Sequence, residues 1–502
     1  MFAWGKQLAY SSWILESSKL SFLFESASTT ETIGRYSFIG VGQWSQLLLQ
    51  PSIVRWLTFF FFLADPRDVI KTGPGHGPEC DPLPNLEKEL SRFRTATIPG
   101  LTLPPLTGGA IGYVGYDCVR YFEPKTARPL KDVLGIPESM FMLFDTVVAF
   151  DHFFQVVKVI HYVRIPESGD DGELERAYIK AQREIQKIVD TLIDPHYELP
   201  PQGPIIPDQK YTSNIGQQGY EEHVRRLKEH VAKGDIFQTV PSQRLARPTS
   251  LHPFNLFRHL RTVNPSPYLF YVDCADFQLV GASPELLAKE ENGRVINHPI
   301  AGTVKRGKTP EDDARLADEL RNSLKDKAEH VMLVDLSRND VNRVCDPLTT
   351  QVDRLMAVEK FSHVQHLVSQ VSGELRPGKT RFDAFRSIFP AGTVSGAPKV
   401  RAMQLIAELE GERRGVYAGA VGYFGYNKAS ADGTSVIPGE MDTCIALRTM
   451  VLKDGVAYLQ AGGGIVFDSD PHEEYVETLN KLGANIQCIR TAEEKYLTMQ
   501  RG

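Results

Sequence analysis

The sequence predicts a mixed α/β fold in which helices and strands build one large unit. Strand-like runs alternate with amphipathic helical patterns along most of the 502 residues, and such alternation is typical of domains that contain both kinds of element. Two glycine-aromatic strands, at 107–116 and 417–426, have nearly the same sequence although they are roughly 310 residues apart. This repeat indicates internal pseudo-symmetry. It favours two interlocked halves of one body over the roughly two to four separate domains that the length allows.

The composition argues against several classes of protein. The net charge of -6 and the lack of a basic stripe argue against a nucleic-acid-binding protein. The six cysteines are scattered without a CxxC pair, which favours reduced cytosolic thiols over disulfides or a zinc site. The first 12 residues lack the basic start and apolar core of a signal peptide. Residues 44–64 are apolar but interrupted by Pro51 and Arg55, so we expect no membrane span and a cytoplasmic protein.

The N-terminal part of the chain contains patterns for several strands and two helices. Asn85 is the expected N-cap of the first helix, whose apolar residues share one face. The expected strands are 20–26, 34–40, 107–116, 141–150 and 155–163, and the expected helices are 85–94 and 172–192.

Residues 41–63 fit none of these patterns, because they have neither a helical nor an alternating period. They include four consecutive phenylalanines, Phe59 to Phe62, and phenylalanine codons contain only pyrimidines. We hypothesise that a retained intron, or an equivalent error in the gene structure, contributes the segment between about 41 and 64. A surface insertion is the alternative. Sequencing of the mature transcript decides, since a transcript that encodes the segment would contradict the hypothesis.

A stretch rich in proline, glycine and glutamine at 195–218 is the expected linker between an N-terminal region, 1–194, and a C-terminal region, 219–490. The later region begins with a helical pattern and continues with strand-like runs. Its expected elements are a helix at 220–233 and strands at 235–240, 269–273 and 279–287.

The stretch from Asn297 to Gly307 predicts a strand that breaks at Gly302 and ends in a basic turn at Lys305 and Arg306. Gly302 and Thr303 can offer backbone N–H groups and a hydroxyl to an anion, and an ordinary surface turn is the alternative. One long helix should follow, with Thr309 as its N-cap. Its core stripe is expected to contain Leu316, Leu320, Leu324, Ala328 and Val331.

Two pairs of carboxylates are spaced three residues apart, so each pair shares one helix face. They are Asp326 with Glu329 and Glu474 with Glu477, and Lys481 follows one turn after the second pair. Together the two helices can supply oxygen ligands of the kind that Mg²⁺ prefers. Solvated acidic faces are the alternative interpretation.

Glycine-rich turns and one histidine are further candidates for a site. Residues 461–465 can bring backbone N–H groups to a carboxylate. Residues 391–399 form a hydroxyl-rich turn before a helix at 400–410, a position that suits anion binding. Ordinary tight turns are the alternative for both. His366 is a candidate for proton transfer or, alternatively, a core histidine.

In their order along the chain these motifs resemble those of the chorismate-utilising enzymes, and among them the component I family of anthranilate synthases. The resemblance covers roughly residues 20–40 and 65–490. The matching motifs are Pro299 to Thr303, Ala328 to His330, Val334 to Asp340, Ala391 to Pro398, Asp442 to Ile445, Arg448 and Glu473 to Lys481. The resemblance implies a single unit with extensive, mostly antiparallel sheets packed between helices, and a substrate site in the C-terminal portion.

The resemblance also implies roles for individual residues. Glu329 and Glu477 would bind Mg²⁺, which holds the C1 carboxylate of chorismate. His366 and Thr393 would flank the substrate ring as catalytic residues, and Arg448 suits a bidentate carboxylate contact. The residues implied in substrate binding are Gly302, Thr303, Tyr417, Arg448, Gly462, Gly463, Gly464 and Lys481.

The implied reaction adds ammonia at C2 of chorismate while the C4 hydroxyl departs, and then eliminates pyruvate to give anthranilate, the first committed step of tryptophan biosynthesis. Two positions discriminate among related enzymes. Ala301 stands where aminodeoxychorismate synthases usually have a nucleophilic lysine, and Gln238 where isochorismate and salicylate synthases have a lysine that activates water. Aminodeoxychorismate synthase and a non-catalytic amino-acid-binding or scaffold subunit are the alternatives.

Two partners are implied as well. The chain lacks the Gly-x-Cys-x-Gly elbow of a glutaminase, so the resemblance implies a separate glutamine amidotransferase subunit that supplies ammonia. It also implies feedback inhibition by L-tryptophan. The residues that match the family's tryptophan site are Ser26, Asn264, Pro267, Tyr268 and Leu269, with leucine at the last position where methionine is common.

Overall fold

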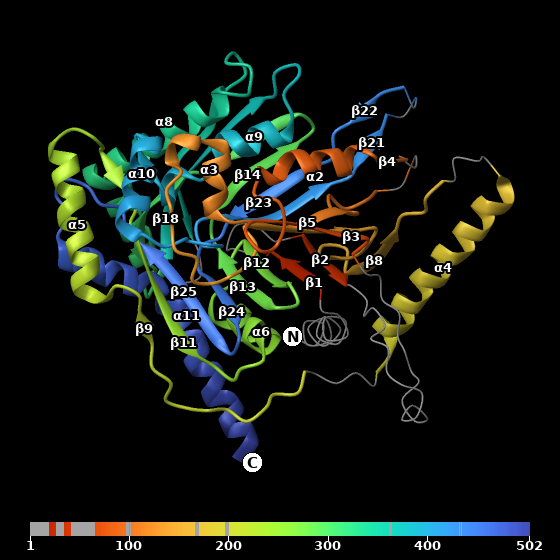
Figure 1. Ribbon diagram of the computed structural model, residues 1–502, viewed down its shortest axis with the longest axis horizontal. Coiled ribbons are helices and arrows are strands. Elements are labelled where there is room, and N and C mark those ends of the chain that lie inside the picture. The colour runs from red at the N-terminus through yellow and green to blue at the C-terminus, as the bar shows by residue number, and fades with distance from the viewer. Residues whose placement is uncertain are drawn as a thin grey trace.

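The computed structural model has two large sheets at its centre and helices on their outer faces (Figure 1). It describes residues 20–26, 35–41, 66–96, 100, 102–165, 170–195, 200–360, 364–430, 432 and 434–501. Apart from Val41, the segment 41–63 of the hypothesised retained intron lies outside the described residues, so that hypothesis stays a prediction.

The first sheet contains ten described strands in the order β8-β7-β2-β1-β12-β13-β24-β25-β11-β9. Strand β1 lies between β2 and β12 and pairs antiparallel with both. The strands are β1 (Ser21–Glu25), β2 (Tyr36–Val41), β7 (Thr146–Asp151), β8 (Val156–His161), β9 (Thr212–Ser213), β11 (Ser242–Pro248), β12 (Tyr268–Asp273), β13 (Phe277–Ser283), β24 (Thr449–Lys453) and β25 (Val456–Gly462).

The second sheet has the order β16-β18-β15-β14-β23-β20-β5-β6-β3, with β17 paired to β18. Its strands are β3 (Asp68–Thr72), β5 (Gly109–Val114), β6 (Ser139–Phe144), β14 (Leu286–Glu291), β15 (Arg294–Asn297), β16 (Ile300–Lys305), β17 (Gln351–Lys360), β18 (Val364–Glu374), β20 (Ala420–Gly425) and β23 (Met441–Ile445). Two small sheets add β10 (Gln238–Thr239) with β19 (Gly396–Ala397), and β4 (Arg94–Thr95) with β21 (Asn427–Ala429) and β22 (Val436–Ile437). The prediction of a mixed fold with mostly antiparallel sheets between helices is confirmed.

The helices cover the outer faces of both sheets (Figure 1). Leu86 of α2 and Phe385 of α9 belong to an apolar core against the second sheet. Phe257 of α6 and Ile489 of α11 belong to another core against the first sheet. The helices are α2 (Pro82–Ser91), α3 (Val119–Phe122), α4 (Asp171–Ile193), α5 (Gly216–Ala232), α6 (Pro253–Val263), α7 (Pro310–Asn322), α8 (Leu324–Asn342), α9 (Arg381–Ile388), α10 (Lys399–Glu410) and α11 (Pro471–Arg501). None of them, within the described residues, is long and apolar enough to cross a membrane.

A third apolar core lies between the two sheets. It contains Phe22 and Val272 from the first sheet and Ile111 and Val421 from the second, all of them buried. Because side chains alternate along a strand, each sheet can face a helical layer on one side and the other sheet on the opposite side. Burial of apolar surface on both faces of both sheets is the main stabilising contribution to such a layered fold.

The two copies of the glycine-aromatic strand pair with each other. Strands β5 and β20 run antiparallel at the centre of the second sheet, with Gly112 opposite Gly422. Added Cβ atoms would lie 1.9 Å from the Met140 carbonyl oxygen at Gly112 and 2.1 Å from the Asp442 carbonyl oxygen at Gly422. Glycine is therefore required where these strands approach their neighbours. Both sheets contain strands from 1–194 and from 219–490, and the division at 195–218 stays a prediction.

Several predicted element boundaries are wrong. The first helix begins at Pro82, where the Asp81 carboxylate accepts a hydrogen bond from Leu83 N, so Asn85 is not its N-cap. The predicted strand 279–287 is divided into β13 and β14 around Pro284, since proline has no N–H for the ladder. The predicted strand 141–150 is likewise two strands, β6 and β7, and only β10 forms within 235–240.

The predicted long helix after Arg306 is two helices, and the predicted core stripe is wrong beyond Leu320, which is itself buried. Ser323 has ψ of 118°, outside the helical region, and its hydroxyl accepts a hydrogen bond from Asp326 N to start α8. The new helix turns a different face inward, so Leu324 is 83% and Val331 53% exposed and Ala328 is also exposed. Its buried residues are His330, Leu333, Val334, Ser337, Asp340 and Val341.

Candidate active site

The break predicted at Gly302 is a bulge in β16. Gly302 has φ of +68°, in the left-handed region that favours glycine, and the register between β16 and β18 shifts between Ala301 and Thr303. His366 of β18 lies opposite, and its Nδ1 is 3.1 Å from the Gly302 carbonyl oxygen and 3.0 Å from the Thr303 hydroxyl. Strand pairing thus brings three of the predicted site residues together.

His366 is a neutral imidazole in this setting. Its side chain is buried, and burial together with the Arg448 cation lowers its pKa to about 4. Because a carbonyl oxygen only accepts hydrogen bonds, Nδ1 carries the proton and donates to Gly302 O. The basic nitrogen is then Nε2. A neutral histidine with a defined tautomer suits proton transfer near neutral pH.

A cavity of about 180 Å³ adjoins His366. Arg448 and Lys481 also line it, which gives its wall two cationic groups. Arg448 has φ of +48°, a left-handed conformation that is strained for a residue with a side chain. Burial lowers the pKa of Arg448 from its ordinary value, but an arginine stays charged at neutral pH. The cavity is therefore suited to a small ligand with more than one carboxylate.

Glu285 is a functional candidate that the sequence analysis did not assign. It lies between β13 and β14, its side chain is buried, and the Thr393 hydroxyl donates to its Oε1 at 3.0 Å. Burial raises the pKa of Glu285 to about 8, so its carboxyl group is protonated at neutral pH. The signal that could have identified it is Pro284, which interrupts an otherwise buried strand directly before an acidic residue. A buried neutral acid next to Thr393 can supply a proton to a leaving group.

The two predicted carboxylate pairs approach each other on α8 and α11. Gln238 Nε2 donates to Glu329 Oε1 at 3.0 Å, and burial raises the pKa of Glu329, with Glu477 adding to the rise and Lys481 opposing it. Lys481 Nζ lies 2.8 Å from Glu477 Oε1. Glu474 is buried and accepts a hydrogen bond from the Ser469 hydroxyl at 2.7 Å.

These carboxylates have donor atoms of the kind that Mg²⁺ prefers. Among the described residues, no group of three or more His, Cys, Asp or Glu side chains is close enough to hold a metal ion as the side chains now lie. However, Glu474 Oε2 is buried and has no hydrogen-bond partner within the described part of the chain, and an unpaired buried carboxylate oxygen is costly without a cation. The residues therefore fit the implied metal in their chemistry, and the site stays a prediction.

The glycines at the end of β25 allow close approach rather than acting as three free donors. The Gly463 N–H donates to the Tyr220 hydroxyl at 3.0 Å, and an added Cβ at Gly462 would lie 2.3 Å from the Pro241 carbonyl oxygen. An added Cβ at Gly464 would lie 2.4 Å from Gln238 Nε2, so a larger residue there would displace the amide that donates to Glu329. Lys481 Nζ donates to Gly462 O at 2.9 Å, which ties this turn to the cavity wall.

The remaining predicted residues fall into two groups. Arg306, at the basic turn, forms an ion pair at 2.6 Å with Asp313 of the helix that follows, α7. The residues matched to a tryptophan site lie at the paired ends of β1 and β12 and in the turn before β12. Strand pairing sets Glu25, directly before Ser26, opposite Leu269, and Tyr268 precedes Leu269 on β12. Asn264 and Pro267 lie in the turn before β12, and Asn264 also lines the cavity.

The chain is similar over most of its length to known proteins of one family. A profile of the chorismate binding enzyme family matches residues 51–487. The anthranilate synthase component 1 of Saccharomyces cerevisiae is 62% identical over 482 residues, which are 95% of this chain and 87% of the yeast protein. A probable anthranilate synthase component 1 of Schizosaccharomyces pombe is 55% identical over 96% of this chain and 90% of its own length.

A solved structure has a similar fold. The crystal structure of anthranilate synthase component I from Streptococcus pneumoniae superposes with a TM-score of 0.71 at 36% identity, covering 87% of this chain and 94% of that chain. Such identity over nearly the whole length of several relatives leaves no other family to consider. The chain belongs to the chorismate binding enzyme family, in its anthranilate synthase component 1 branch.

Proposed function

We propose that this chain acts as component I of an anthranilate synthase and converts chorismate and ammonia to anthranilate, pyruvate and water. The names of the similar proteins support this function. The single observation that carries it is the chemistry at the cavity. The neutral imidazole His366 and two cations, Arg448 and Lys481, line it, and the neutral acid Glu285 directly follows the lining residue Pro284.

Binding and orientation come from the two cations and the bulge. Chorismate is a dianion, and Arg448 and Lys481 supply complementary charges on the cavity wall. Gly302 and Thr303 adjoin His366 and complete the binding surface on that side. When bound by Glu329 and Glu477, Mg²⁺ would add positive charge that holds a substrate carboxylate.

The first half of the reaction is an addition with loss of water. Ammonia forms a bond to C2, the C1=C2 and C5=C6 double bonds shift to C1=C6 and C4=C5, and the C4–O bond breaks. Glu285 gives its proton to the departing hydroxyl, which leaves as water, and the new ammonium nitrogen returns a proton to the Glu285 carboxylate. The role of Thr393 is to hold Glu285 in position, because its hydroxyl donates to that carboxyl group.

The second half is an elimination that makes the ring aromatic. Nε2 of His366 takes the proton from C2, and the electron pair moves into the ring as the C3–O bond breaks. The released enolpyruvate takes a proton on its methylene carbon and becomes pyruvate. Nε2 of His366 can take this proton at neutral pH because burial lowers the pKa of the imidazole to about 4.

Two residues support ammonia as the nucleophile. Gln238 is buried and its amide has no basicity to activate water. Ala301 is buried and supplies no amine that could attack the ring. The alternative of an aminodeoxychorismate synthase finds no support among the names of the similar proteins.

Two further parts of the proposal concern partners and regulation. We propose a separate glutamine amidotransferase subunit as the source of ammonia, since the similar proteins are named as component 1. We also propose inhibition by L-tryptophan at the site that includes Ser26, Tyr268 and Leu269. Asn264 supports this, because its buried Nδ2 has no partner in the described part of the chain. We expect the protein to work in the cytoplasm.

The product assay tests the function. Purified protein is mixed with chorismate, Mg²⁺ and ammonium, and anthranilate is followed by its fluorescence. Formation of anthranilate supports the proposal. Formation of 4-amino-4-deoxychorismate instead would support the aminodeoxychorismate alternative, and no turnover would support a non-catalytic subunit.

A further inference from the structure

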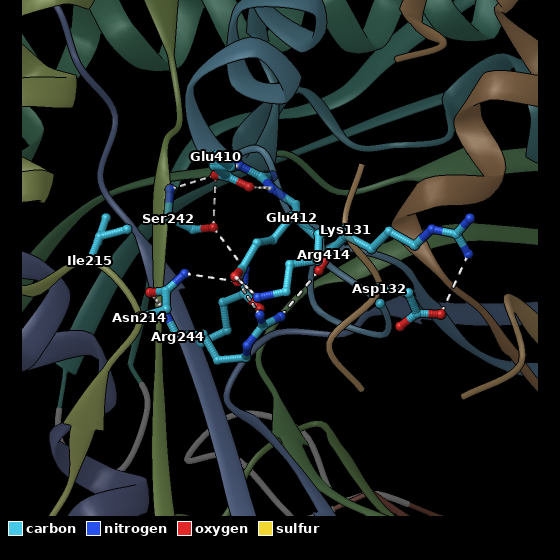
Figure 2. A network of polar contacts seen from close by, with 12 residues as sticks. Lys131, Asp132, Asn214, Ile215, Ser242, Arg244, Glu410, Glu412 and Arg414 are labelled. Atoms are coloured by element: carbon cyan, nitrogen blue, oxygen red, sulfur yellow. Dashed lines mark hydrogen bonds and ion pairs between the residues drawn. The ribbon is translucent and has the colours of Figure 1, made fainter. Parts of the chain in front are cut away.

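A buried ion pair between Arg414 and Glu410 lies outside the set of site residues described above. Arg414 is 2% exposed, and its guanidinium donates to both carboxylate oxygens of Glu410, at 2.9 and 2.7 Å. The Glu410 side chain is only 7% exposed and also accepts from the Ser242 backbone N–H and hydroxyl, each at 2.8 Å. Figure 2 shows the Glu410 carboxylate between Ser242 and Arg414.

The guanidinium has two further acceptors, and both are backbone carbonyl oxygens. Nη1 donates to Val394 O at 3.0 Å and Nη2 to Val240 O at 2.6 Å. All three nitrogens of Arg414 are therefore bonded. A buried charge is costly unless it is paired and its hydrogen bonds are satisfied, and this one meets both conditions.

The two carbonyls belong to segments that carry site residues. Val394 directly follows Thr393, whose hydroxyl bonds to Glu285. Val240 comes two residues after Gln238, which bonds to Glu329. One rigid guanidinium thus fixes the distance between the segment that holds Glu285 and the segment that holds Glu329.

A third segment meets the same cation. The guanidinium carbon lies 5.5 Å from the ring centroid of Tyr417 and 4.5 Å from that of Tyr116, within the range of cation–π attraction. An added Cβ at Gly462 would lie 3.2 Å from the Tyr417 hydroxyl, so Tyr417 packs against this turn, and Gly462 O accepts a hydrogen bond from Lys481. Arg414 therefore also contacts the segment of Tyr417, which packs against the turn at the end of β25.

We propose that Arg414, held by Glu410, is a positioning residue for catalysis: it keeps the segments of Thr393, Gln238 and Tyr417 in one arrangement without touching the substrate. The inference rests on the proposed function. Misplacement of catalytic groups by about 1 Å can cost on the order of 100-fold in rate. The expected signature is a loss in kcat at nearly constant KM, because Arg448 and Lys481 still bind the dianion.

Arg414→Lys tests the proposal, with Arg381→Lys as the matched control. Lysine keeps the charge but cannot reach four acceptors from one nitrogen. Arg381 is buried as well, at 3% exposed. It donates to two backbone carbonyls, Gly439 O and Glu440 O, and its guanidinium lies over the ring of Phe382, none of which is a site residue. Both variants are expected to lower Tm. Only R414K should lower kcat by about 100-fold, with KM within about 3-fold of the unsubstituted protein.

A double-mutant cycle separates positioning from general weakening. If Arg414 acts through Thr393, then adding R414K to Thr393→Val should lower kcat by much less than R414K does alone. Independent, multiplicative losses would overturn the proposal, as would equal kcat values for R414K and R381K. Absence of anthranilate with the unsubstituted protein would instead contradict the proposed function, so the two failures are distinguishable.

Glu410→Gln is the second variant in case R414K does not fold. It keeps the shape of the side chain but removes the counter-charge that holds the guanidinium. We expect kcat to fall about 10-fold with KM nearly unchanged. An unchanged kcat in this variant would also overturn the proposal.

Discussion

At the scale of single residues, the chemistry of the site depends on burial more than on residue type. Glu285 and His366 are ordinary titratable groups, but both are buried and therefore neutral near pH 7. A neutral acid and a neutral base can then operate at the same pH, which two exposed groups of these types do not do. Their roles follow from their surroundings.

Replacement of Glu285 tests its role as the proton donor. Glu285→Gln keeps the size of the side chain and a hydrogen-bond donor. Because its amide cannot give up a proton, we expect kcat to fall by about 1,000-fold. The rate of the unsubstituted protein should fall as pH rises through about 8, because the carboxyl group then loses its proton. Steady-state rates between pH 6 and 9.5 measure this limb, and its survival in the glutamine variant would contradict the assignment.

The raised pKa of Glu285 also predicts how the stability of the fold changes with pH. The folded pKa of Glu285, about 8, is above its ordinary value of 4.5, so the folded state binds a proton that the unfolded state has lost between these values. Stability from this group is complete below pH 4.5 and declines as pH rises toward 8. In thermal unfolding, the Tm of Glu285→Gln relative to that of the unsubstituted protein should therefore rise from pH 5 to pH 8.

At the scale of elements, one break in a helix decides where Glu329 lies. Ser323 ends α7 and caps α8, and the new helix directs His330 and Leu333 inward while Glu329 is half-buried beside Gln238. Apolar periodicity across 316–331 predicted one continuous helix, because leucines and alanine happened to recur at helical spacing. Only tertiary packing shows that half of that stripe faces solvent.

The bulge in β16 was correctly predicted, in contrast to the break between α7 and α8. Gly302 was predictable as a break in the strand, because glycine punctuates strand patterns and allows positive φ. The partner of the bulge was not predictable, since His366 is far away in the sequence and meets Thr303 only through the register of β18. The neutral state of Glu285 was not predictable either, because it comes from burial by other elements.

Glu329 supplies the test at this scale, with Asp335 on the same helix as its control. Glu329→Gln removes a charged ligand and should abolish Mg²⁺-dependent turnover, a loss of roughly 100-fold or more. Asp335→Asn should keep its activity, because the Asp335 side chain is 79% exposed and away from the carboxylate pair. Rates over a magnesium titration measure both. Near-normal activity of Glu329→Gln would remove this residue from the proposed ligand set.

At the scale of the whole molecule, the N-terminal and C-terminal regions share both sheets. Strand β1 pairs with β12 in the first sheet and β5 with β20 in the second. The sequence repeat predicted this interlocking, since the two glycine-aromatic strands need partners with small residues. The strand order and the cavity were not predictable, because both depend on pairings between residues hundreds of positions apart.

The close packing of the repeat predicts a strong effect on stability. Gly422→Ala would force a Cβ to 2.1 Å from the Asp442 carbonyl oxygen, so we expect a loss of roughly 3 kcal/mol or more in the free energy of unfolding. Gly483→Ala is the control, because Gly483 lies within α11 and nothing is within 4 Å of an added Cβ. That variant should gain up to about 1 kcal/mol. Urea unfolding measures both, and equal effects would contradict the packing argument.

The central claim, that this site aminates chorismate and then eliminates pyruvate, is tested most directly by following both products in one reaction. Purified protein is given chorismate, Mg²⁺ and ammonium, and anthranilate and pyruvate are measured over the same time course. The proposed function predicts that the two appear together in equal amounts and that neither forms without ammonium. Accumulation of an amino- or hydroxy-substituted chorismate without pyruvate, or no consumption of chorismate, would contradict it.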